Sequence, residues 1–123
     1  MKTKTFISEF SLNKEITVSI LGKDDYRYDL LKPLFEEYGP GFADTKAGWV
    51  FINGEAGLNR AELKWIEAHE AAHIRLKHTM GERNAEDEYV ADSQAKLYLL
   101  KHGYKKSAEL VSKYSIERHG NQI

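Results

Sequence analysis

The chain has 123 residues, with 18 basic and 19 acidic side chains, a formal net charge of −1 at pH 7 and no cysteine. This length fits one domain, residues 1–123, with a modest hydrophobic core, and the near-neutral charge gives no electrostatic footprint for nucleic acid. The lack of cysteine excludes disulfides, thiolate metal sites and cysteine nucleophiles, so histidines and carboxylates are the remaining candidate metal ligands.

The first third of the chain is rich in strand-forming residues. Residues 4–10 and 15–21 predict two strands, and the second run alternates apolar and polar side chains. Residues 47–52 predict a third strand, which the turn dipeptide Asn53-Gly54 closes. We therefore expect a small N-terminal sheet.

A first helix is predicted between the second and third strands. Residues 28–38 place leucine and aromatic side chains at helical spacing, and Gly-Pro-Gly at 39–41 ends the pattern. Pro33 is expected in the first turn of this helix, where its missing N–H costs nothing.

Two asparagines mark the starts of the next helices, the first of them in a capping-box arrangement. Asn59 with Glu62 opens a helix expected from about 60 to 78, broken by residues 79–81. Asn84 with Asp87 opens the following one.

The helix after Asn84 is expected to end at Gly103, and Ser107 is the predicted cap of the last helix. On that helix Leu110, Val111 and Tyr114 are expected to face inward. The order β-β-α-β-α-α-α predicts a compact α+β domain.

All apolar runs are short. None approaches the roughly 20 residues of a membrane span, and no apolar stretch of a signal peptide follows the first residues. We expect a soluble, cytoplasmic monomer.

The His-Glu-Ala-Ala-His stretch at residues 69–73 is the strongest functional signal. On a helix, His69 and His73 lie on one face and can aim two ring nitrogens at one point. Zn²⁺ binds such nitrogens together with a third protein ligand and an open position. Glu70 reaches the same cleft, where its carboxylate can take a proton from an activated water. The alternative is an ordinary charged helix face, but Leu63 and Ile66 on the same side make unsatisfied polar groups costly there.

A second i, i+4 pair supplies the third ligand. Glu88 and Asp92 present two carboxylates on one helix face. We predict that Glu88 takes the third zinc position and that Asp92 accepts a hydrogen bond from one of the histidine rings. A solvated acidic helix start is the alternative, which we keep for Glu86 and Asp87.

His78 is another possible third ligand. Five residues beyond His73 correspond to about 140° around a helix, so we expect His78 to point away from the metal. We interpret His78 and His102 as histidines near helix ends, and His119 as part of a frayed tail.

These motifs carry a family resemblance. His-Glu-x-x-His followed by Glu-x-x-Ala-Asp at 88–92 resembles the gluzincin metallopeptidases, and within them the heat-shock and CAAX-processing endopeptidase family without its membrane helices. The size and element order resemble the minigluzincins. The resemblance covers residues 49–104 and lacks the His-Pro-Ser and Arg-Ile ending of the heat-shock relatives.

The resemblance implies a zincin fold and a zinc metalloendopeptidase that hydrolyses a peptide or protein substrate. It makes His69, His73 and Glu88 the zinc ligands, Glu70 the general base and acid, and Asp92 the support of a ligand. It also implies an edge strand above the cleft at 49–52, where a peptide would pair by β-augmentation. The substrate-binding candidates are therefore Trp49, Val50 and Phe51, unless this segment is a plain core strand.

Gluzincins also supply a donor to the oxyanion of the tetrahedral intermediate. The candidates here are Tyr104, Tyr114, Arg118 and His119.

Two rival functions remain open. One is a regulatory zinc protein of the ImmA/IrrE type that acts on a repressor, and the other is a latent zincin that serves as a binding module. For latency, residues 115–123 are the candidate segment, because they lack the apolar spacing of a docked helix. They form either a disordered terminus or a segment that enters the cleft and blocks it.

Overall fold

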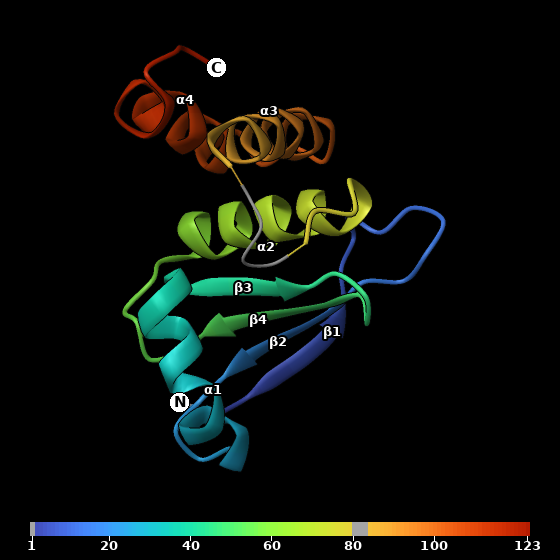
Figure 1. Cartoon of the computed structure of the whole chain (residues 1–123), viewed down its shortest axis with the longest axis vertical. Helices are drawn as coiled ribbons and strands as arrows, with labels where there is room; N and C mark the ends of the chain where they lie inside the picture. Colours follow the sequence, from blue (N-terminus) through green and yellow to red (C-terminus); the bar gives the residue numbers. More distant parts are fainter. Residues whose placement is uncertain (1, 80–83) are drawn as a thin grey trace.

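A computed structural model describes residues 2–79 and 84–123 (Figure 1). In chain order the elements are β1 (Lys4–Ile7), β2 (Thr17–Leu21), α1 (Tyr26–Tyr38), β3 (Gly41–Asp44), β4 (Trp49–Asn53), α2 (Arg60–Arg75), α3 (Ala85–Lys101) and α4 (Lys105–His119). In Figure 1 the sheet forms one layer, α2 lies directly over it, and α3 and α4 form a further layer over α2. The α+β prediction is confirmed.

The sheet contains one strand more than predicted. Its order is β1-β2-β4-β3, with β4 parallel to β2 and antiparallel to β3. Strand β3 follows the Gly-Pro-Gly turn, and its four residues are too few to show an alternating pattern. Because β4 is hydrogen-bonded on both sides, the prediction that residues 49–52 form an edge strand is wrong.

Alternating side chains give the sheet two apolar faces. Val18, Ile20, Val50 and Ile52 belong to the main core, together with Ala68 and Ala71 of α2. The opposite face carries Leu21, Phe42 and Phe51, which pack with Tyr28 and Phe35 of α1. The first of these cores supports the helix that bears the two motif histidines.

Helix α1 begins earlier than predicted. The Asp25 side chain accepts a hydrogen bond from the backbone N–H of Arg27 and caps the helix. Pro33 lies inside the helix and not in its first turn. At this interior position its missing N–H costs the helix one backbone hydrogen bond.

The predicted capping box at Asn59 with Glu62 is confirmed, and Asn84 with Asp87, predicted to open the next helix, forms a second capping box. Helix α2 ends at Arg75, three residues before the predicted end, and part of the predicted break at 79–81 lies outside the described residues.

The beginning of α4 differs from the prediction. Tyr104 is the N-cap residue and makes no side-chain capping bond. Ser107 lies inside the helix, where its buried hydroxyl donates to the Ala61 carbonyl oxygen of α2 at 2.8 Å. Ser107 therefore fastens α4 to α2 and is not a cap.

The expectation of a frayed, disordered tail is also wrong, whereas the alternative, a segment that blocks the cleft, stays a prediction. Helix α4 continues to His119, and Ser115 is fully buried. Beyond the helix, the Ile123 carbonyl oxygen accepts hydrogen bonds from Lys96 and Ser112 on α3 and α4. Val111 is buried as predicted, whereas Leu110 and Tyr114 are half-buried. Among the described residues, no helix has the length and apolar character needed to cross a membrane.

Candidate metal centre

Helices α2 and α3 bring three potential ligand atoms together. His69 Nε2 lies 2.9 Å from Glu88 Oε2 and 3.1 Å from His73 Nε2, and His73 Nε2 lies 3.3 Å from Glu88 Oε2. Ala91 and Ala95 on α3 have no exposed surface, and these small side chains allow α3 to approach α2 closely. The three residues that the sequence selected thus form one group that could hold a metal ion.

The donor set fits a small divalent cation. A tetrahedral ion with ligands at roughly 2.0–2.1 Å separates those ligands by about 3.3 Å, close to the three distances observed. Two imidazole nitrogens and one carboxylate oxygen leave a fourth position open, as in catalytic zinc sites.

His69 is fixed from behind by a buried carboxylate. Its Nδ1 lies 2.8 Å from Asp92 Oδ1, and since an ionised carboxylate only accepts hydrogen bonds, Nδ1 carries the proton. Asp92 also accepts from Trp65 Nε1 at 3.2 Å, and its other oxygen contacts Arg118 Nε at 2.9 Å and His119 Nε2 at 2.6 Å. Asp92 therefore supports His69, as predicted, and joins α2, α3 and α4.

The electrostatics of the group favour positive charge. Burial lowers the pKa of His69, but hydrogen bonds with Asp92 and Glu88 outweigh burial and raise the pKa to about 9. Burial raises the pKa of Glu88, but its hydrogen bonds with His69 and His73 hold that pKa well below its ordinary value. A proton on His69 or a metal cation would supply the charge that this arrangement stabilises.

As predicted, His78 lies just beyond the end of α2 and outside the three-residue group, but its side chain turns toward His73 and not away from the group. Its Nδ1 lies 2.8 Å from Nδ1 of His73. The prediction assumed that the helix continues to His78, whereas α2 ends at Arg75 and Lys77 adopts a left-handed backbone, with φ of 59°. His78 therefore lies behind His73, on the side away from His69 and Glu88.

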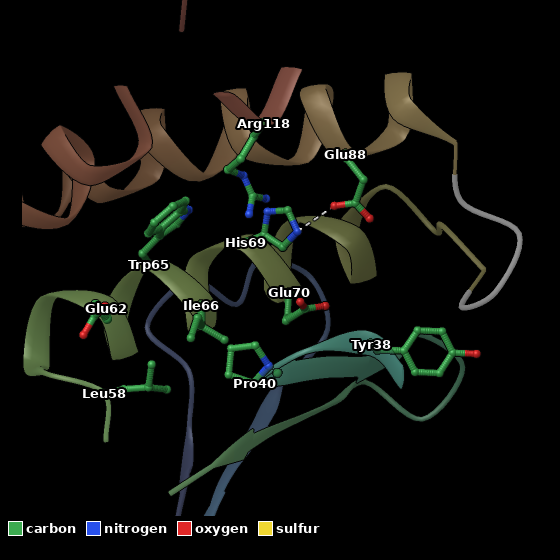
Figure 2. Close-up of a pocket in the computed structure, with 11 residues that line it drawn as sticks. Tyr38, Pro40, Leu58, Glu62, Trp65, Ile66, His69, Glu70, Glu88 and Arg118 are labelled. Atoms are coloured by element: carbon green, nitrogen blue, oxygen red, sulfur yellow. Dashed lines mark ion pairs between the residues drawn. The ribbon is translucent and has the colours of Figure 1, made fainter. Parts of the chain in front are cut away.

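A pocket of about 530 Å³ opens beside the group (Figure 2). Its polar lining includes His69, Glu70, Glu88 and Arg118, and its apolar lining includes Leu58, Trp65 and Ile66. Glu70 is buried at the pocket wall and is not one of the three grouped residues. In Figure 2 the guanidinium of Arg118 projects from α4 into the space beside His69.

The predicted substrate-binding residues do not line this pocket. Val50 is fully buried in the core, and Trp49 and Phe51 stack on each other with ring centroids 5.8 Å apart. Pro40 and Gly41, at the start of β3, line the pocket instead. A Cβ at Gly41 would lie 2.4 Å from Ile66 Cγ2, so glycine is what lets β3 come this close to α2.

Of the four candidate oxyanion donors, Arg118 alone is among the described residues that line the pocket. The Tyr104 hydroxyl donates to Glu9, and Tyr104 lines a different pocket. Tyr114 stacks on Trp65 with centroids 6.1 Å apart, and the ring of His119 is buried against Asp92.

Sequence reasoning missed two contributors. Trp65 lies four residues before His69 on the same helix face, a spacing that could have identified it. His78 had no such signal, because its position depends on how α2 ends.

Comparisons of the chain with protein-family models, curated proteins and solved structures found no match. The case for a function therefore depends on the motifs and on the geometry of the site.

Proposed function

We propose that this protein is a zinc-dependent metallopeptidase of the gluzincin type. The observation that carries this proposal is that His69, His73 and Glu88 meet beside a pocket. Glu70 lines the same pocket. Two histidines and one glutamate, with a glutamate adjacent to the first histidine, are the residues that metal-assisted peptide hydrolysis uses.

Within this proposal, Glu70 moves the proton. Bound Zn²⁺ would polarise the scissile carbonyl and bring the pKa of a water near 7. Glu70 accepts the proton of the attacking water and delivers it to the leaving amine. It can take this role because it lines the same pocket as His69 and Glu88 and is not one of the three grouped residues.

Arg118 is the proposed donor to the developing oxyanion. Asp92 holds its Nε at 2.9 Å, and the Trp65 ring lies 5.2 Å from its guanidinium carbon. These two contacts fix the plane of the guanidinium, whose remaining N–H groups project beside His69 (Figure 2). A donor positioned in advance in this way stabilises charge as it develops.

The proposed peptide-binding edge is β3 and not β4. Pro40 O accepts from Asn53 N at 2.8 Å, and Asp44 O accepts from Gly48 N at 2.9 Å. Since alternate residues of an antiparallel strand face its partner, the backbone groups of Gly41 and Ala43 face away from β4. Both residues are buried and Gly41 lines the pocket, so an extended substrate would pair with these groups only after the segments that cover β3 move aside.

The test is Glu70→Gln, assayed with unfolded casein. The amide cannot accept the proton, so we expect hydrolysis to fall by about 10²- to 10⁴-fold while one zinc per chain and the fold are retained. Elemental analysis and circular dichroism check the retained properties, with His73→Ala as the metal-free reference. Glu86→Gln, on the acidic first turn of α3 and outside the pocket lining, is the matched control that should keep full activity.

Equal hydrolysis by the wild type and Glu70→Gln would refute the peptidase proposal. Loss of zinc or of folding in Glu70→Gln would show that Glu70 has a structural role instead.

A further inference from the structure

We propose that His78 is a positioning residue that sets the tautomer and orientation of the ligand His73. This inference rests on the proposed metal ligation by His73 and does not require peptidase activity. His73 has a fully buried side chain, and that of His78 is 15% exposed. Their Nδ1 atoms lie 2.8 Å apart, so one ring donates a hydrogen bond and the other accepts it.

The neighbours of both rings determine which one donates. Nε2 of His73 faces His69 and Glu88, and it can offer a lone pair to a metal only if Nδ1 carries the proton. Nδ1 of His78 must then accept, and the proton of His78 resides on its Nε2. That nitrogen lies 3.4 Å from Oδ1 of Asp87, a carboxylate that only accepts. The order Asp87, His78, His73 is thus consistent at every contact.

The turn after α2 places His78 where it can do this. His78 N donates to His73 O at 2.9 Å, and Lys77 N donates to Ile74 O at 3.1 Å, which are the two bonds of a Schellman motif. The left-handed position of this motif usually holds glycine, but here it holds Lys77 with φ of 59°. Such a backbone costs on the order of 1 kcal/mol, and strained positions of this kind cluster at functional sites.

An imidazole suits the position behind His73 better than another carboxylate would. Glu70, Glu88 and Asp92 already place three carboxylates around the two ligand histidines. An imidazole behind His73 fixes that ring without a further carboxylate in direct contact with it. His69, by contrast, has Asp92 in that place.

The experiment measures Zn²⁺ affinity by competition with a chromophoric chelator, together with the visible spectrum of the Co²⁺-loaded protein. In His78→Asn the amide oxygen stands near the position of Nδ1 and can still accept from His73, whereas in His78→Gln the amide lies near the position of Nε2. We expect His78→Asn to bind Zn²⁺ within about threefold of the wild type. We expect His78→Gln and His78→Leu to bind about 10- to 100-fold more weakly, with a changed Co²⁺ spectrum.

The matched control is His102→Leu, which removes a histidine that contacts Glu9 far from the group and should leave affinity and spectrum unchanged. Equal affinities of His78→Asn and His78→Gln would overturn the proposal, and so would a wild-type Co²⁺ spectrum in His78→Leu. Asparagine and glutamine are both polar and similar in size, so the test remains decisive if His78→Leu does not fold. A wild type that binds no metal would refute the proposed function as well, whereas a metal-loaded protein without peptidase activity would refute that function alone.

Discussion

The two histidines of the candidate metal centre are held in different ways. Asp92 supports His69 from 23 residues further along the chain, and it gathers donors from α2 and α4 as well. His78 supports His73 from five residues away, through one turn at the end of α2. One ligand therefore depends on the packing of three helices and the other on local backbone geometry. Changes on the His69 side should affect the whole fold, and changes on the His73 side should affect metal binding first.

The largest effect is expected from Asp92→Ala. This change leaves the donors of Trp65, Arg118 and His119 without their shared acceptor, and breaking a buried charge network costs about 3–5 kcal/mol. Because Arg118 is 39% exposed and can be solvated, we expect a loss near the lower end of this range in urea denaturation of the metal-free protein.

Glu86→Ala, on the acidic first turn of α3, is the control for the Asp92 measurement and should change the free energy of unfolding by less than about 0.5 kcal/mol. A loss below about 1 kcal/mol in Asp92→Ala would contradict the view that the His69 side depends on helix packing.

A smaller effect on the His69 side should appear as a dependence of the free energy of unfolding on pH. The pKa of His69 rises from 6.5 to about 9 on folding, so the metal-free native state binds this proton more tightly than the unfolded chain does. The resulting stabilisation is fully present below pH 6.5 and is lost as the pH rises through about 9. In this window the free energy of unfolding should fall by at most about 1.4 kcal/mol per pH unit.

Urea denaturation in the presence of a chelator, at a series of pH values, measures this slope. His69→Gln should lose most of it, and a variant with the wild-type slope would assign the titration to another group.

The smallest effect concerns the turn on the His73 side. Lys77→Gly removes the left-handed strain but gives the unfolded chain more freedom, so we expect a net gain of about 0.5–1 kcal/mol in thermal or urea unfolding. Lys77→Ala keeps the strain and is the control, with little expected change. Zn²⁺ affinity should stay at the wild-type value in both variants, because His78 keeps its position. Destabilisation by glycine would show that Lys77 makes a contribution beyond backbone geometry.

Local sequence signals predicted the frame of the site. The two capping boxes gave the starts of α2 and α3, and the i, i+4 pairs on these helices gave the three grouped residues and Asp92. These signals succeed because helical geometry alone places residues four positions apart next to each other on one face.

The features that sequence reasoning missed depend on tertiary contacts or on one backbone angle. Strand β3 exists because β4 offers it a partner. The polar end of α4 resembled a solvated tail because the partner of Arg118 and His119 is a buried carboxylate on another helix. The direction of the His78 side chain was predicted wrongly because Lys77 adopts a left-handed backbone conformation, which is rare for residues other than glycine and turns the chain back.

The four side-chain contacts of Asp92 with residues of α2 and α4 also bear on when the site forms during synthesis. The ribosome releases α2 and α3 before α4, and because a domain folds as a unit, its fold is complete only after α4 has emerged. Until α4 docks, Asp92 lacks the donors Arg118 and His119, and His69 lacks a rigid anchor. We therefore expect a nascent chain to bind the proposed ion late, after α4 is in place. Such timing would keep the proposed hydrolytic centre idle while the surrounding polypeptide is still unfolded and vulnerable to cleavage.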